Sequence, residues 1–429
     1  MLKIISLFFL YLPFQFALNA SADVDLASIR LFSIFIFLLW IFQGLRNKKI
    51  NIRHSPITLL VFSFLFLSIF SLFFSENISW GARKLIFLLS FIPLYFVFSD
   101  LFSKWKLNIK TLLEYLIWGA FLSSLIGLIQ FTLQFIFGIE KAYSLWTKIV
   151  IPFLGHSFSD AVLKNPSWLV NIGGHTLVRA TSLFPDPHIF SFYLGMTAPI
   201  ILSMLFISKK KIFFGVILFF VLLVDFLTFS RGGYLGILSG LLFFSIFFSN
   251  KKKLSSISNE SNSNYYKTTP IKNFLLINLI VLIFITLFII PNPINKRLLS
   301  IFNLKEGSNA GRIKIWEESL PIIANNPFFG VGLGNYPLAI KPSANYREPI
   351  YAHNTYLDIA SETGILNALF WILIIFISLA NYVKKYKKDD EIIYLGLSSG
   401  LVVFAIHSFF ETAIFSVHIL PLFIFLISF

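Results

Sequence analysis

The 429-residue sequence has no cysteine, and only 13% of its residues are charged. The lack of cysteine excludes disulfides and thiolate chemistry. The shortage of charge excludes an ordinary soluble domain, in which about 25% of residues are charged. Hydrophobic residues make up 57% of the chain instead, and phenylalanine alone occurs 54 times. This composition predicts a polytopic membrane protein that forms a single integral membrane domain over residues 1–429.

A membrane-spanning helix needs roughly 20 apolar residues, and irregular backbone cannot face lipid. The apolar runs therefore predict an all-α protein with about twelve transmembrane helices. The predicted spans are 3–18, 26–45, 57–74, 84–99, 112–137, 188–207, 212–229, 233–249, 272–290, 355–380, 392–410 and 413–429.

The net charge of +15 lies mainly in alternate connections between the spans. Because cytoplasmic loops are enriched in Lys and Arg, both termini are predicted to be cytoplasmic. The dispersal of these residues argues against nucleic-acid binding. The basic connections contain Arg46, Lys48, Lys49, Arg53, Lys104, Lys106, Lys110, Lys209, Lys210, Lys211, Lys251, Lys252, Lys253, Lys267, Lys384, Lys385, Lys387 and Lys388. One of them, the Ser- and Asn-rich segment 250–271, is predicted to be a flexible cytoplasmic linker.

Two long connections, 138–187 and 291–354, fall on the outer side in this topology. Long loops in a compact protein are usually functional or disordered, and these two contain too many aromatic residues for disorder. Apolar residues recur at helical spacing from Ala310 to Ala324 and predict a short amphipathic helix on the membrane surface. Its apolar positions are Ile313, Trp316, Leu320 and Ile323.

Several polar residues, which are energetically unfavourable inside a membrane, fall in the outer halves or outer ends of the predicted spans. They are Gln130, Gln134, Asp225, Arg231, His353, Asp358, Glu362, His407, Glu411 and His418. Ionisable groups inside a membrane are candidates for function, and their shared depth predicts one site near the outer leaflet. The alternative is a set of separate helix-end residues that only touch water.

The segment from His353 to Ala380 is 28 residues long, which as one helix would span about 42 Å. The hydrocarbon core is about 30 Å thick, so the first turns should project beyond it. Asn354, Asp358 and Glu362 recur every four residues and would share one face, toward a wet cavity. Alternatively, Asn354 only caps the helix and His353 only sits at the interface.

Other motifs are weaker. Gly330, Gly332 and Gly334 lack the strand-then-helix setting of a nucleotide-binding loop and are predicted to form a tight turn. No His/Glu pair has the spacing of a zinc helix, so no metal site is predicted. The Gly-x-Ser-x-Gly motif of serine hydrolases is also missing.

The region 179–380 contains a set of short motifs. They are Arg179-Ala180-Thr181, Phe184-Pro185-Asp186-Pro187-His188, Ser230-Arg231-Gly232-Gly233, Gly311-Arg312, Asn326-Pro327-Phe328-Phe329-Gly330-Val331-Gly332, and His353-Asn354-x-x-Leu357 followed by Glu362-x-Gly364. In combination, these motifs resemble those of the O-antigen ligase/polymerase family. The resemblance implies transfer of a glycan from undecaprenyl pyrophosphate to an acceptor hydroxyl. The reaction would invert the sugar configuration, need no metal or other cofactor, and occur at the outer (periplasmic) face of the plasma (inner) membrane.

The resemblance also implies roles for individual residues. His353 would be the general base, because imidazole titrates near pH 6.5. Arg231 and Arg312 would hold the pyrophosphate, since guanidinium is always charged and forks onto two oxygens. The other substrate-binding candidates are Arg179, Lys314, Arg347, Asn354, Asp358 and Glu362. Asp225 is a candidate partner of Arg231, and Asp358 a candidate for orienting His353.

Within this family, a polymerase of O-antigen or surface polysaccharide repeat units is preferred, because polymerases are its more numerous members. The alternative is a ligase that joins the finished glycan to lipid A core or to protein. A transporter or flippase of lipid-linked sugar is less favoured. Transporters place charges near the bilayer midplane and carry internal repeats, whereas this sequence clusters its charges at one leaflet and shows no clear repeat.

Overall fold

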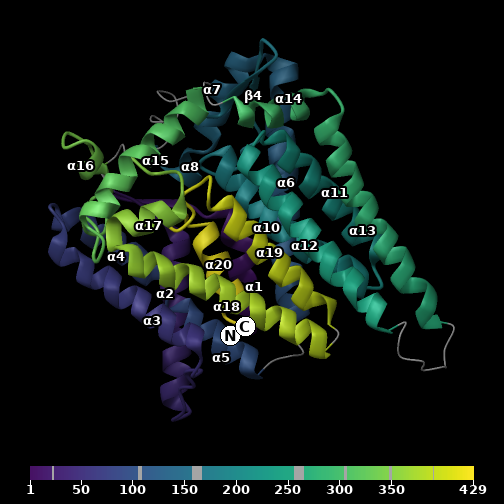
Figure 1. The fold of residues 1–429 in the computed structure, drawn as a ribbon, viewed down its shortest axis with the longest axis horizontal. Helices are drawn as coiled ribbons and strands as arrows, with labels where there is room; N and C mark the ends of the chain where they lie inside the picture. The colour runs from purple at the N-terminus through teal and green to yellow at the C-terminus, as the bar shows by residue number, and fades with distance from the viewer. Residues whose placement is uncertain are drawn as a thin grey trace.

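The computed structural model describes residues 1–21, 24–104, 109–156, 167–255, 265–303, 307–346, 350–389 and 391–429. The long helices lie side by side as a bundle, and α7, β4, α14 and α15 gather at one end of it (Figure 1). The helices are α1 (Leu2–Tyr11), η1 (Leu12–Phe14), α2 (Ser28–Arg46), α3 (Pro56–Phe70), η2 (Ser71–Phe74), α4 (Ile78–Phe91), α5 (Leu94–Lys104), α6 (Ile109–Phe137), α7 (Ile139–Ile149), α8 (Ile151–Leu154), α10 (Pro187–Ile207), α11 (Lys211–Leu227), α12 (Arg231–Ser255), α13 (Tyr265–Ile289), α14 (Pro293–Leu299), η3 (Ser300–Phe302), α15 (Gly307–Asn325), α16 (Tyr336–Ile340), α17 (Thr355–Thr363), α18 (Ile365–Asp389), α19 (Ile392–His407) and α20 (Ile419–Ile427).

Within the described residues, seven helical segments are long and apolar enough to cross a membrane, which confirms a multi-pass membrane protein. The segments are Ser28–Arg46, Pro56–Phe74, Ile78–Phe102, Ile109–Phe137, Pro187–Ile207, Arg231–Phe248 and Ile365–Asp389. The other five predicted spans correspond to α1, α11, α13, α19 and α20. Their helices or apolar stretches are shorter, and α20 has only nine residues. The total of twelve spans therefore stays a prediction.

The predicted continuous helix over 355–380 is wrong, because the chain breaks at Gly364 into α17 and α18. Gly364 has a φ of +92°, and a Cβ on it would collide with the carbonyl of Phe328. The amide of Ile365 then donates to the carbonyl oxygen of Pro327 at 2.9 Å. The break separates the nine-residue α17 from the membrane-crossing α18.

The two long connections contain more secondary structure than the sequence indicated. The first holds α7, α8 and an antiparallel hairpin of β3 (Leu169–Ile172) and β4 (His175–Val178). A second antiparallel strand pair is formed by β1 (Ala17–Ser21) and β2 (Val24–Ala27), so the fold is not purely helical.

The helix predicted for 310–324 is present as α15, but Leu320 on its predicted apolar face is 59% exposed. Of the predicted linker 250–271, residues 250–255 belong to α12 and residues 265–271 belong to α13, whereas residues 256–264 lie outside the described residues.

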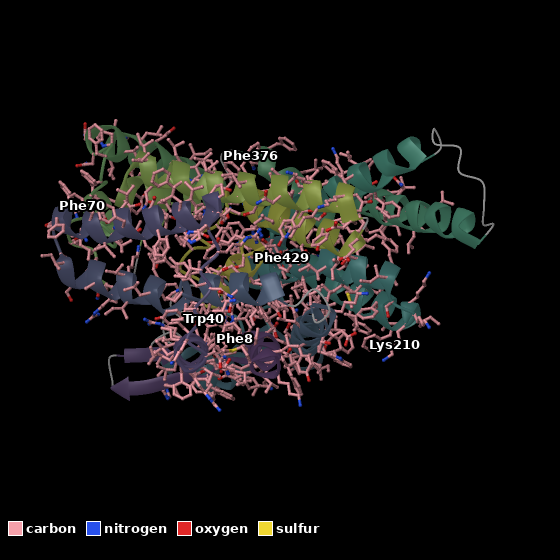
Figure 2. The ribbon with its side chains drawn as sticks, turned by 90° about the horizontal axis from the view of Figure 1, so that it is seen from below. Phe8, Trp40, Phe70, Lys210, Phe376 and Phe429 are labelled. Carbon is pink, nitrogen blue, oxygen red and sulfur yellow. The ribbon has the colours of Figure 1, made fainter. Side chains whose placement is uncertain are left out.

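Side chains divide the bundle into a packed interior and an apolar outer surface. Phe429 lies near the middle of the view in Figure 2, is buried and stacks on Phe102 with ring centroids 3.5 Å apart. Phe376 lies at the upper edge and is 67% exposed. Such exposed phenylalanines suit a surface covered by lipid. Both chain ends lie away from the end that carries α7 and α15 (Figure 1).

Candidate functional site

A histidine and a carboxylate form the centre of the candidate site. His353 Nδ1 lies 3.3 Å from Glu411 Oε1. An ionised carboxylate can only accept hydrogen bonds, so Nδ1 carries the proton in this pair. When His353 is neutral, Nε2 therefore holds the free lone pair that could accept a proton from a substrate. The His353 side chain is 44% exposed and Glu411 is 11% exposed, so a substrate can reach the ring.

The backbone at His353 is in an unusual conformation, with a φ of +49°. Non-glycine residues seldom adopt positive φ, and such strain persists only where surrounding contacts impose it. Asp358 supplies two of these contacts. Its Oδ1 accepts from the amide of Ala352 at 2.8 Å, and its Oδ2 accepts from the hydroxyl of Thr412 at 2.5 Å. Asp358 thus holds the residue before His353 and the residue after Glu411, rather than the imidazole itself.

Two residues at the start of α17 also help to hold the segments that carry His353 and Glu411. Asn354 caps the helix, and its Oδ1 accepts from the amides of Tyr356 and Leu357 at 3.0 and 3.2 Å. The hydroxyl of Thr355 donates to the carbonyl of Glu411 at 2.8 Å and accepts from the amide of Ala413 at 2.9 Å. The segment that carries Glu411 is therefore hydrogen-bonded directly to the helix that follows His353.

The pair changes the proton affinity of both partners. Burial opposes protonation of His353, but the charge and hydrogen bond of Glu411 outweigh burial and raise the pKa of His353. Burial would likewise raise the pKa of Glu411, yet its interaction with His353 lowers that pKa well below the usual range. The carboxylate therefore stays ionised and stabilises the imidazolium that forms when His353 accepts a proton.

Arg231 and Arg312 line one cavity of about 150 Å³. Arg231 is the first residue of α12, whereas Arg312 comes from α15. The remaining lining residues are Gly232, Leu235, Asn309, Ile313, Trp316 and Phe410. The cavity adjoins the His353–Glu411 pair. Phe410, which lines the cavity, precedes Glu411, and the indole N–H of Trp316 donates to the carbonyl of Ala352 at 2.8 Å. The charge of Arg312 also acts on both His353 and Glu411.

The guanidinium of Arg231 is held by hydroxyls. Its Nη1 donates to Ser300 at 2.9 Å and its Nη2 to Ser308 at 2.5 Å. Asp225, which the sequence offered as its partner, instead accepts from the hydroxyl of Ser191 at 2.6 Å. These two hydroxyls orient the guanidinium at the wall of the cavity.

Arg179 lies deeper and is only 3% exposed. Its Nε donates to the carbonyl of Thr228 at 2.7 Å, and its Nη1 lies 3.4 Å from His188 Nε2. Burial and the neighbouring Arg297 lower the pKa of Arg179 to about 9. The predicted intramembrane residue Gln130 anchors this segment, since its Nε2 donates to the carbonyl of Arg179 at 2.9 Å.

The other candidates lie elsewhere. Glu362 is buried and pairs with Lys84 at 2.5 Å, so the predicted wet face of Asn354, Asp358 and Glu362 is in fact packed against protein. Lys314 is 76% exposed and faces Glu318 at 3.9 Å on the surface of α15. Arg347 lies outside the described residues.

Sequence reasoning missed two basic residues near these groups and left Glu411 without a role. Arg297 on α14 acts electrostatically on Arg179, and its Nε is 3.5 Å from the carbonyl of Phe229. Lys84 pairs with Glu362, whereas the hydropathy pattern indicates only that residue 84 begins the predicted span 84–99. Glu411 was grouped with the polar residues of the outer leaflet. Its depth was the only indication, because sequence does not show which histidine a carboxylate faces.

The described residues bring together no set of three or more His, Asp or Glu side chains that could hold a metal ion. The site places an imidazole with a carboxylate partner beside a cavity lined by two guanidiniums. Such a set can accept a proton from a hydroxyl and bind a phosphate-bearing leaving group.

The comparisons with known proteins agree with this chemistry. Residues 214–372 match a family model described as O-antigen ligase. The matched segment contains Arg231, Arg312 and His353, while Arg179 and Glu411 lie outside it. A search of curated proteins found no significant match. Residues 214–372 are therefore similar to the O-antigen ligase family, in agreement with the motifs of this chain that resemble the O-antigen ligase/polymerase family.

Proposed function

We propose that the protein transfers a glycan from undecaprenyl pyrophosphate to an acceptor hydroxyl at the outer face of the plasma membrane, and that it polymerises O-antigen or surface polysaccharide repeat units. The family match supports glycan transfer of the O-antigen ligase or polymerase type. The observation that carries the proposal is the cavity lined by Arg231 and Arg312 beside the His353–Glu411 pair.

In the proposed reaction, the acceptor hydroxyl oxygen attacks the anomeric carbon of the donor sugar from the face opposite the pyrophosphate. The new glycosidic bond forms as the bond from the anomeric carbon to phosphate oxygen breaks, which inverts the configuration. Nε2 of His353 takes the hydroxyl proton, and Glu411 stabilises the resulting imidazolium. Undecaprenyl pyrophosphate leaves with the electron pair.

The two guanidiniums would bind the pyrophosphate and stabilise the charge that develops on it. In this proposal they take the place of the divalent cation that many phosphate-handling enzymes use, so transfer needs no metal. Arg179 does not line the cavity, because its Nε donates to the carbonyl of Thr228; in this proposal it contributes only positive charge near the site. Asn354, Asp358 and Glu362 act through the protein, because their side chains are buried and bonded to it.

A ligase that transfers a finished glycan to lipid A core or protein is the second candidate, and the description of the matching family favours it. Deleting the gene and sizing the lipid-linked glycans separates the two. Loss of a polymerase should leave single repeat units on the lipid carrier, whereas loss of a ligase should leave long chains stranded there. An unchanged pattern of lipid-linked glycans and surface polysaccharide would contradict both.

A further inference from the structure

Lys84 is a cation inside an apolar helix. It lies on α4, within the membrane-crossing segment Ile78–Phe102, and its side chain is 11% exposed. Its Nζ lies 2.5 Å from Oε1 of Glu362, which is 2% exposed. Charged residues are costly in such helices and are retained where they have a specific partner and role. The family match does not extend to residue 84.

The ammonium group also contacts two aromatic rings. Its Nζ is 4.1 Å from the ring centroid of Phe415 and 5.2 Å from that of Tyr351. A cation near an aromatic ring is attracted by the electrons of the ring face. Tyr351 comes two residues before His353, and Phe415 comes four residues after Glu411. The ammonium of Lys84 therefore contacts both the chain segment that carries His353 and the one that carries Glu411.

Hydrogen bonds from the 331–335 segment also join the two helices that carry Lys84 and Glu362. Near the start of α4, Asn335 exchanges hydrogen bonds with the backbone of Asn77, at 2.7 Å to its amide and 3.2 Å from its carbonyl. At the end of α17, the amide of Val331 donates to the carbonyl of Ser361 at 2.9 Å. Lys84 and Glu362 thus join two elements that the 331–335 segment already ties together.

We propose that Lys84 is a positioning residue, which fixes the His353 segment against the Glu411 segment through Tyr351 and Phe415. This inference rests on the proposed function for its catalytic consequence. The charged groups that act on His353 are Glu411, Asp358 and Arg312. Those around Lys84 are Glu362, its direct partner, and Asp358, on which its charge acts.

The direction of the change in the His353 pKa distinguishes positioning from a simple charge effect. Removing a nearby cation would by itself make His353 easier to protonate and raise its pKa. Loosening the contact with Glu411 would do the opposite, because that contact is what raises the pKa against burial. Positioning by Lys84 therefore predicts that the pKa of His353 falls when Lys84 loses its ammonium.

The test compares the full-length protein with Lys84→Met and with the double variant Lys84→Met/Glu362→Gln. The double variant avoids a buried carboxylate without a partner, which could itself prevent folding. Arg83→Met is the matched control, since Arg83 is the adjacent cation and stacks on Tyr346 instead. The pKa of His353 is titrated by NMR on protein with labelled histidine, in which His353→Ala assigns the signal. Glycan transfer from a lipid-linked donor is measured alongside.

We expect the pKa of His353 to fall in both Lys84 variants and to stay unchanged in Arg83→Met. The kcat should fall by about 10- to 100-fold, as displaced catalytic groups commonly cause, with the KM for the donor unchanged. In a Glu411→Gln background, Lys84→Met should produce no further shift of the His353 pKa, because the contact through which it acts is already lost.

An unchanged or raised pKa of His353 in the folded double variant would overturn the positioning role, as would a shift that adds fully to that of Glu411→Gln. Because the titration does not depend on turnover, these results separate the two proposals. A wild-type protein that transfers no glycan contradicts the proposed function alone, whereas a normal titration in the double variant contradicts only the role of Lys84.

Discussion

His353 and Glu411 are 58 residues apart in the chain, yet Nδ1 of one lies 3.3 Å from Oε1 of the other. The contact leaves Nε2 as the basic nitrogen and provides a negative charge that stabilises the protonated ring. Asp358 braces both sides of the pair through Ala352 and Thr412. This geometry supports the proposed role of His353 as a general base with a carboxylate partner.

Replacing Glu411 with Gln should move the pH dependence of transfer. The raised pKa of His353 means that the base is still protonated above pH 6.5, so the wild-type rate should begin to fall at a higher pH than for an ordinary histidine. Without the carboxylate, burial dominates and the pKa should drop below 6.5. The acid limb of the rate–pH profile then shifts to lower pH, although the maximal rate falls. Glu318→Gln on the exposed face of α15 is the control and should leave the profile in place.

His353→Ala should abolish transfer but leave donor binding largely intact. Removing a positioned general base typically lowers a rate by about 10²- to 10⁴-fold. The pyrophosphate would still meet Arg231 and Arg312, so the Kd for the lipid-linked donor should hardly change. A transfer assay and a binding assay on the same purified variant check both parts. Normal transfer by this variant would remove His353 from the mechanism.

A chelator should leave wild-type transfer unchanged, because the proposal assigns the charge of the leaving group to the two arginines. The measurement is the initial rate before and after treatment with EDTA. Silencing by EDTA and rescue by a divalent cation would reopen a metal-dependent mechanism.

Arg231→Lys and Arg312→Lys should each lower activity by more than tenfold while the protein still inserts in the membrane. Lysine keeps the charge but loses the fork that binds two phosphate oxygens. Lys314→Gln is the comparison, since Lys314 is 76% exposed, faces Glu318 and does not line the cavity, so little change is expected there. Near-normal rates in both arginine variants would show that neither acts at the reacting centre.

Reporter fusions test the orientation. Fusions after Lys253 and Lys388 should report the cytoplasm, whereas fusions within 138–187 and 291–351 should report the exterior. An exterior signal at Lys253 would reverse the topology and place the His353 site on the cytoplasmic side.

Gly330→Ala should destabilise the protein. Gly330 has a φ of +64°, and an added Cβ would collide with the backbone of Ser361 and Glu362. Backbone strain alone costs about 1–3 kcal/mol at such positions, and the collision adds to it. Gly174→Ala is the control, because Gly174 also has a positive φ, +89°, but has no atom within 4 Å of an added Cβ. Thermal unfolding in detergent should show a larger loss for Gly330→Ala; equal losses would mean that α17 does not depend on this close approach.

Local patterns predicted a substantial part of the architecture. The apolar runs gave the positions of α2, α6 and α10 to within a few residues. The glycine pattern indicated the tight turn at 330–334, where all three glycines have positive φ. The broken helix at Gly364 was missed, since hydropathy continues through that residue and the collision with Phe328 comes from a different part of the chain.

The sequence by itself determined that this is a multi-pass membrane protein with motifs of the O-antigen ligase/polymerase family, because hydropathy and motif spacing are local properties. It also singled out His353, Arg231 and Arg312 through those motifs. Only the tertiary structure decided that Glu411 rather than Asp358 contacts His353, that Ser300 and Ser308 rather than Asp225 hold Arg231, and that Lys84 pairs with Glu362. These pairs join distant segments, and the packing of helices selects among several chemically equivalent partners.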